Sequence, residues 1–131
     1  MTAERINPPD LSPPKGFSHA VVATGNRVVF LAGQTALDPD GRITGDTLPE
    51  QFEQALGNLL AALHAAGAAP ADLARVTVYT TDVAAYRSHA PELGLIWRRS
   101  AGRTYPAMAV IGVVRLWDER AMVELDGFAV L

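Results

Sequence analysis

Cysteine is absent from the 131 residues of this chain. Its absence excludes disulfide bonds, thiolate nucleophiles and thiolate metal sites. The three histidines, His19, His64 and His89, also lack the close spacing of a metal-binding motif. We therefore expect no metal, no other cofactor and no redox chemistry by the chain itself.

Basic clusters and long apolar runs are also missing. Lys and Arg total 11 against 14 Asp and Glu, for a net charge of -3, whereas a nucleic-acid-binding surface needs a basic patch. The first 16 residues carry four prolines and both charge signs where a signal peptide needs an apolar core, and no other run is long enough to cross a bilayer. We expect a soluble, cytoplasmic protein with no nucleic-acid or membrane partner.

Apolar residues, by contrast, are abundant. They make up 49% of the chain, and charged residues make up 19%. A length of 131 residues favours one domain, residues 1–131, with a single core. The composition is more apolar than a small monomer needs, so we expect part of the surface to be buried against other copies of the chain.

Turn, cap and periodicity signals divide the chain into strands and helices. The proline-rich residues 1–16 predict an extended N-terminal arm with little regular structure. The following segments predict a β-hairpin at 19–33, a helix from Asp46 or Thr47 to about Gly67, a strand at 75–81, a helix at about 83–101 capped by Asp82, and strands at about 107–115 and 121–130. This order predicts an α+β protein with a mixed sheet and two helices on one face.

The strand expected at 107–114 is apolar on both faces. Met108 and Val110 point one way, and Ala109 and Ile111 point the other. Because two helices can cover only one side of a four- or five-stranded sheet, we expect the other side to meet neighbouring subunits.

The last strand carries two carboxylates on one face. Glu124 and Asp126 alternate with Val123 and Leu125, so they stand opposite the expected helices. One interpretation is a hydrated rim or structural hydrogen bonding. The other is a carboxylate at a subunit seam that orients a water molecule or acts as a general acid or base.

Five segments in order resemble the YjgF/Rid family of small homotrimeric enamine/imine deaminases, also called L-PSP proteins. They are GFSHAV, VVFLAGQTALDPDGRITGD, QFEQALGNLLAALHAAGAAPADLARVTVYTTD, YPAMAVIGVVRL and VELDGFAV, and they cover almost the whole chain from about residue 16. The resemblance implies the chorismate-mutase-like α+β fold and a homotrimer whose three clefts lie between subunits.

The resemblance implies a substrate-binding role for two residues that depart from the family pattern. Typical deaminating members carry an arginine after Pro-Ala that holds the substrate carboxylate through a bidentate pair, and here that position is Met108. A thioether packs against apolar groups but cannot neutralise an anion. Phe17 stands where the family has a tyrosine, so the aromatic wall remains without its hydroxyl. We therefore expect a cleft that disfavours the usual small 2-imino acid.

The resemblance also implies a catalytic residue. The family glutamate that helps to place the attacking water aligns with Glu124. Water would add to the C=N carbon, and the carbinolamine would collapse with release of ammonia, with Glu124 assisting both proton transfers. Alignment with the family pattern across WDERAM, just before this strand, needs one inserted residue. Asp126 is therefore the alternative candidate for the role of the family glutamate.

Two further residues are candidates for ligand binding. His19 is either an acid, base or hydrogen-bond donor that reaches the cleft or an ordinary histidine at the end of a strand. Gly33 matches a family glycine, and it either lets the backbone approach a ligand or neighbour or forms a bulge or turn.

Three further polar residues are weaker candidates for a functional role. Arg103 either replaces the positive charge missing at Met108 or is a solvated loop residue. Ser88 and His89 are adjacent, and adjacency on a helix does not place a hydroxyl against a base. No nucleophile is predicted from this pair.

The resulting functional hypotheses fall into two classes. The first is a hydrolase or deaminase that acts on a reactive enamine, imine or related unsaturated small molecule, including a larger unsaturated acid such as an aminomuconate. The second is a non-catalytic trimer that binds a small molecule or has a regulatory role. The resemblance fixes a cleft but not its ligand.

Overall fold

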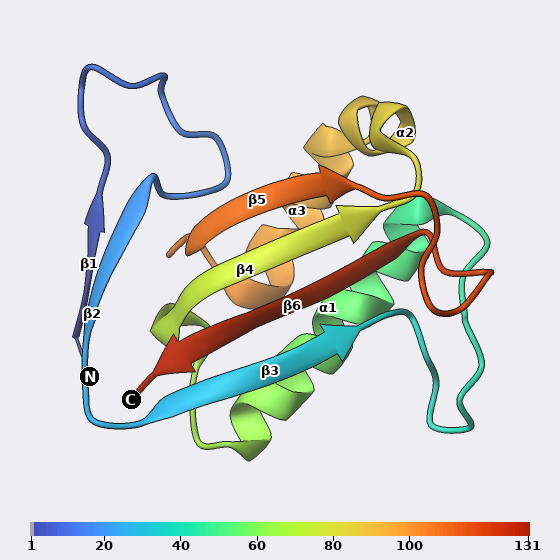
Figure 1. The fold of residues 1–131 in the computed structure, drawn as a ribbon, viewed down its shortest axis with the longest axis horizontal. Coiled ribbons are helices and arrows are strands. Elements are labelled where there is room, and N and C mark those ends of the chain that lie inside the picture. Colours follow the sequence, from blue (N-terminus) through green and yellow to red (C-terminus); the bar gives the residue numbers. More distant parts are fainter. Residues whose placement is uncertain (1) are drawn as a thin grey trace.

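A four-stranded mixed sheet with helices on one face forms the centre of the molecule (Figure 1). The computed structural model describes residues 2–131. Its elements are β1 (Thr2–Ile6), β2 (Ala20–Thr24), β3 (Val28–Gln34), α1 (Leu48–Ala65), a 3-10 turn η1 (Pro70–Asp72), β4 (Leu73–Thr80), α2 (Val83–Ser88), α3 (Ala90–Ala101), β5 (Ala107–Gly112) and β6 (Val123–Val130). Within these residues, none of the helices is both long and apolar enough to cross a membrane.

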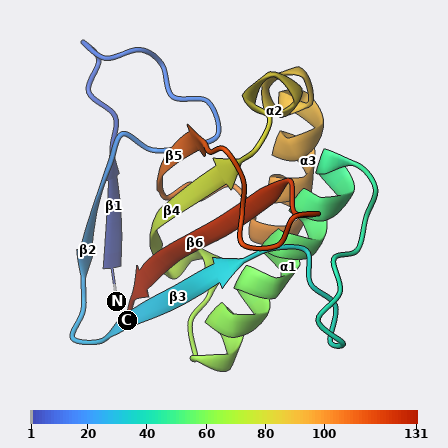
Figure 2. The ribbon, with the colours of Figure 1, turned by 45° about the vertical axis from the view of Figure 1, so that its right-hand side comes forward.

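The strands of the main sheet have the order β3-β6-β4-β5. The β4 and β5 strands are parallel, because α2 and α3 cross over between them, and the other two pairs are antiparallel. In β4 and β6 the side chains on the helix side are fully buried, among them Val76, Val78, Val123 and Leu125. The sheet is therefore covered by helices on one side only, as the sequence predicts (Figure 2).

The prediction of a β-hairpin at 19–33 is wrong. The β2 strand pairs with β1 in a separate two-stranded ribbon, and β3 pairs with β6 instead. The amides of Asn26 and Arg27 both donate to the carbonyl of Leu131, 2.9 and 3.1 Å away. An added Cβ at Gly25 would lie 2.2 Å from the same oxygen. The turn therefore packs against the end of β6 rather than closing a hairpin.

The N-terminal arm predicted at 1–16 contains more regular structure than expected. Residue 1 lies outside the described residues, and Thr2–Ile6 form β1, antiparallel to β2. The four prolines all lie beyond the paired segment, so they do not interrupt its hydrogen bonds.

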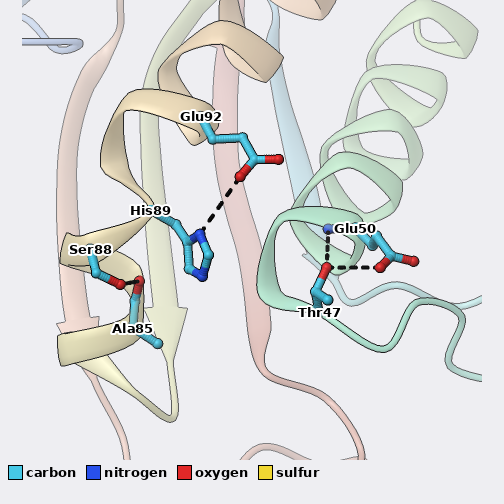
Figure 3. A network of polar contacts seen from close by, with 6 residues as sticks. All are labelled: Thr47, Glu50, Ala85, Ser88, His89 and Glu92. Atoms are coloured by element: carbon cyan, nitrogen blue, oxygen red, sulfur yellow. Dashed lines mark hydrogen bonds and ion pairs between the residues drawn. The ribbon is translucent and has the colours of Figure 1, made fainter.

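The long helix α1 begins as its sequence predicts. The Thr47 hydroxyl accepts a hydrogen bond from the Glu50 amide at 3.3 Å and donates to the Glu50 carboxylate at 2.9 Å (Figure 3), and Pro49 lies in the first turn. Its apolar stripe is buried against the sheet, including Phe52 and Leu56. The local cap and periodicity were sufficient to locate this helix.

The second predicted helix is interrupted. Asp82 caps it as expected, because its carboxylate accepts the Ala85 amide at 2.9 Å. The chain then breaks into α2 and α3 at His89, two residues before Pro91, which has no amide hydrogen to continue the helical pattern. The break allows α2 and α3 to follow different directions, and α3 lies behind the sheet beside α1 (Figure 1).

A buried glutamine fixes the start of β6. Gln51 of α1 is only 1% exposed, and its amide nitrogen donates to the carbonyls of Gly45 and Arg120 at 3.2 and 3.1 Å. Its side-chain oxygen accepts the Met122 amide at 2.8 Å. The bonds to Arg120 and Met122 join α1 to the loop before the strand that carries the candidate catalytic carboxylate, and the bond to Gly45 joins it to the loop before α1.

Candidate functional site

A cavity of about 720 Å³ lies on the helix side of the sheet, next to β5. Its wall comes from the segment before β2, one residue of α1, helices α2 and α3, and β5. The members on which the argument below depends are Lys15, Phe17, Tyr86, Gly94, Trp97, Arg98, Met108 and Val110. The volume is typical of sites for drug-sized molecules rather than three-carbon metabolites.

Two of the predicted substrate-binding residues meet in this wall. Met108 lies opposite Val76 in the β4–β5 register, and Val76 is completely buried beneath the helices, so both side chains face the helix side. Phe17 approaches the same cavity from the segment before β2. Both side chains are apolar, so neither can neutralise an anion.

Tyr86 lines the cavity and carries a neutral hydroxyl. Burial raises the pKa of its phenol to about 12, so it is protonated at any physiological pH. Its ring meets the edge of Phe52, with centroids 6.2 Å apart and an angle of 70° between the planes. Tyr86 can therefore donate a hydrogen bond to a ligand but cannot act as a base.

Trp97 presents a buried donor that lacks an acceptor. Its side chain is 4% exposed, and its indole nitrogen has no hydrogen-bond partner among residues 2–131. A buried N–H without a partner costs free energy. The residue that carries this unpaired donor also lines the cavity.

Two cationic side chains that sequence reasoning did not identify line the cavity. Lys15 and Arg98 both contribute to the wall, and both are exposed. Arg103, the candidate replacement for the missing charge, is exposed but does not line the cavity. The sequence signal that could have located this wall is Gly94, a glycine inside the apolar stripe of a helix.

The two carboxylates of β6 stand on the opposite face of the sheet. Glu124 lies beside Tyr79 and Asp126 beside Thr77 in the β4–β6 register, away from the helices. Partial burial raises the pKa of Glu124 above its usual value of 4.5, and the charge of Asp126 raises it further. A carboxyl group with a raised pKa is better suited to exchange protons near neutral pH.

Gly33 provides the space that Glu124 occupies. A Cβ built at residue 33 would lie 2.6 Å from Oε2 of Glu124 and 2.9 Å from its carboxyl carbon. Gly33 also lies in the irregular stretch of the β3–β6 pairing, between Leu31 and Gln34. Gly33 therefore lies at a bulge and at a close approach to a neighbouring side chain, and its contact with a ligand stays a prediction.

The candidate residues thus form two groups separated by the sheet. Phe17 and Met108 face the cavity on the helix side, whereas Glu124 and Gly33 touch each other on the exposed side. Within one chain, no ligand can contact Met108 and Glu124 through the buried core between them.

His19 is placed outside the cavity wall. Its Nε2 lies 2.7 Å from the Ser12 carbonyl and therefore donates a hydrogen bond to it, and its amide donates to Asn7 at 2.8 Å. Its ring also meets the edge of Phe17, with centroids 5.1 Å apart. In this chain His19 supports the segment that carries Phe17.

Ser88 and His89 do not form a nucleophile and base. The Ser88 hydroxyl donates to the Ala85 carbonyl at 2.9 Å, and Nδ1 of His89 faces the Glu92 carboxylate at 3.6 Å (Figure 3). Across residues 2–131, no group of three or more His, Asp or Glu side chains could hold a metal ion.

The fold and the two-sided arrangement define a class of small α+β proteins with one helix-covered sheet face and one exposed face. The family model described as Endoribonuclease L-PSP matches residues 9–131. The chain therefore belongs to the YjgF/Rid family, and the predicted α+β fold is confirmed.

Individual relatives agree with this assignment. A solved Rid-family structure, YyfB from Yersinia pestis, is 32% identical, covers 100% of both chains and superposes with a TM-score of 0.91. A RutC family protein of Synechocystis sp. is 33% identical over 134 residues, covering 100% of this chain and 98% of its own. A Dermatophagoides farinae protein named 2-iminobutanoate/2-iminopropanoate deaminase is 26% identical, covering 100% of this chain and 99% of its own.

Proposed function

We propose that this chain is a hydrolase that deaminates a reactive enamine or imine in a cleft shared between subunits of a homotrimer. The observation that carries the proposal is the Glu124 carboxyl, which has a raised pKa and rests against Gly33 on the sheet face that the helices leave uncovered. The name of the Dermatophagoides farinae relative supports the same class of reaction. The two carboxylates would then lie at a subunit seam rather than at a hydrated rim.

Subunit association would unite the two groups of residues. The sheet face that carries Glu124 also exposes apolar side chains, including Phe30 at 81% and Ile111 at 43%. Soluble monomers rarely leave such a surface in water. A second copy packed against this region would bury it and bring the Glu124 of one chain toward the cavity of another. In this arrangement Phe17 and Met108 bind the substrate, and Glu124 acts on it.

Glu124 would assist both halves of the hydrolysis. The oxygen of a water molecule attacks the C=N carbon, Glu124 accepts a proton from that water, and the imine nitrogen gains a proton to give a carbinolamine. Glu124 then accepts the proton of the hydroxyl group and passes it to the amino nitrogen, the C–N bond breaks, and the nitrogen leaves as ammonia. One imine and one water thus give one carbonyl compound and one ammonia. An enamine enters this sequence after it takes a proton on carbon.

Met108 argues against the usual small 2-imino acid as the substrate. Without an arginine at this position, a carboxylate of a short substrate has no bidentate partner beside the reacting carbon. A second candidate is a larger unsaturated acid such as an aminomuconate. Lys15 and Arg98 favour it, because they could hold a carboxylate at the far end of a longer molecule.

Turnover by Glu124→Gln and Asp126→Asn tests the proposal. Imines are generated in place by an amino acid oxidase, and ammonia and carbonyl release is followed above the uncatalysed rate. We expect the Glu124 variant to keep its assembly and lose roughly a hundred- to ten-thousandfold in turnover. Loss of turnover in the Asp126 variant alone would show that Asp126, and not Glu124, is the catalytic carboxylate. No acceleration of any imine by the unmodified chain would overturn the proposal and favour a binding or regulatory trimer.

A further inference from the structure

Gly94 has no structural reason to be glycine within the chain. It lies inside α3, where glycine costs about 0.5–1 kcal/mol relative to alanine. Its φ is not positive, and a Cβ added to it would meet only Nη1 of Arg98, at 3.5 Å, an ordinary contact distance. A side chain at this position would instead enter the cavity, whose wall Gly94 forms.

The walls beside Gly94 are aromatic. Trp97 follows it by three residues on the same helix, and Tyr86 and Phe17 line the same cavity. Aromatic side chains stack with one another and with ligand rings at little conformational cost. Met108, across the cavity on β5, adds a polarisable sulfur that also favours contact with rings.

We propose that the cavity binds a ligand that carries an aromatic ring, with the ring seated in the space left by Gly94. This inference rests on the proposed function and specifies its substrate as an aryl-bearing imine or enamine. The ring lies between α3 and Met108, and any acidic group of the ligand lies toward Arg98 and Lys15. Gly94 is then the residue that determines specificity for size, because a side chain there occupies the position of the ring.

The test measures binding of three stable probes to the full-length chain. Phenylpyruvate carries a ring and a carboxylate, phenylacetone carries the ring alone, and pyruvate carries the carboxylate alone. Trp97 is the reporter, and Trp117→Phe removes the other tryptophan, whose side chain is 97% exposed. We expect both aryl probes to change the emission of Trp97 and to bind at least tenfold more tightly than pyruvate.

Filling the cavity should abolish this preference. Gly94→Leu should weaken both aryl probes at least tenfold and leave the thermal midpoint unchanged or higher. Gly57→Leu is the matched control, since Gly57 is an exposed glycine of α1 with no atom within 4 Å of an added Cβ. Val110→Leu narrows the cavity from β5 without adding a ring or a second emitter and should also weaken the aryl probes, which keeps the test decisive if the Gly94 variant does not fold.

Two results would overturn the aromatic specificity. One is equal binding of pyruvate and the aryl probes, and the other is unchanged aryl binding in folded Gly94→Leu and Val110→Leu. The outcome is separable from that of the proposed function. Tight aryl binding without turnover of any imine would refute the proposed deaminase function and support the aromatic binding site. Turnover without an aryl preference would support the deaminase function and refute the aromatic binding site.

Discussion

The carboxylate of Glu124 rests against the backbone of Gly33, and the two residues come from neighbouring strands 91 positions apart in sequence. An added Cβ at residue 33 would lie 2.6 Å from Oε2, closer than real Cβ atoms approach an oxygen. The obstructing atom is the end of a flexible side chain, so the carboxylate can move aside at small cost. Gly33 therefore positions Glu124 without being needed for folding.

Gly33→Ala should separate catalysis from stability. The methyl group displaces the carboxylate, and we expect turnover to fall at least tenfold while the thermal midpoint changes little, because misplacement by about 1 Å can cost a hundredfold in rate. Gly57→Ala, on the exposed side of α1, controls for the loss of a glycine and should retain full turnover. Equal turnover by the two variants would show that Gly33 does not position Glu124 for catalysis.

The raised pKa of Glu124 predicts a specific pH dependence of stability. Because its pKa is higher in the folded state than the ordinary 4.5, its contribution to the free energy of unfolding is fully present below pH 4.5 and is lost as the pH rises through the folded value. Glu124→Gln should remove this loss, so the variant gains stability relative to the unmodified chain as the pH rises. Urea unfolding at several pH values between about 4 and 7 measures the difference.

Asp126→Asn offers the internal control for that experiment. Its charge is the second cause of the raised pKa, after burial, so the variant should shift the pH dependence of Glu124 only partly toward the ordinary value. A parallel fall in stability with pH in all three proteins would show that Glu124 is not responsible.

Met108→Arg should place a guanidinium on β5, at the position where the wall of the cavity now carries a thioether. Charge-assisted bidentate bonds contribute about 1.5–3 kcal/mol, which corresponds to a rise of roughly ten- to a hundredfold in kcat/KM for 2-iminopropanoate. Met108→Leu conserves the apolar wall and should leave this activity as low as before. If the arginine variant gains nothing, the missing charge is not what limits small 2-imino acids.

Phe30→Lys tests the assembly. Phe30 stands beside Phe128 on the exposed sheet face, with ring centroids 6.2 Å apart. Light scattering should report three chains for the unmodified protein. An unpaired charge in a buried interface costs about 3 kcal/mol, so the lysine variant should dissociate at a concentration at least a hundredfold higher. Ala61→Lys, on an exposed position of α1, should remain a trimer, and a monomer in the unmodified protein would overturn the shared cleft.

Gln51→Leu should destabilise the fold more than any surface change. The substitution leaves the Gly45 and Arg120 carbonyls and the Met122 amide without their partners, at a combined cost of about 3 kcal/mol in the free energy of unfolding. Gln54→Leu, which loses one bond to Asn58, should cost less than about 1 kcal/mol. Denaturant unfolding compares the two, and similar losses would show that the buried network is not important for stability.

The sequence by itself determined the features that depend on near neighbours along the chain. The caps at Thr47 and Asp82 follow from side chains that bond to amides three residues away. The faces of β6 follow from strict alternation, so the placement of Glu124 opposite the helices was predictable. The α+β fold followed from the order of these elements together with the resemblance to the YjgF/Rid family.

Only the tertiary structure decided which distant segments meet. The partners of β2 and β3 depend on the packing of the Gly25 turn against Leu131, which no local pattern reveals. The contact between Gly33 and Glu124 and the cavity around Gly94 have the same origin. Each is formed by residues far apart in sequence, and the packing of whole elements determines whether they touch.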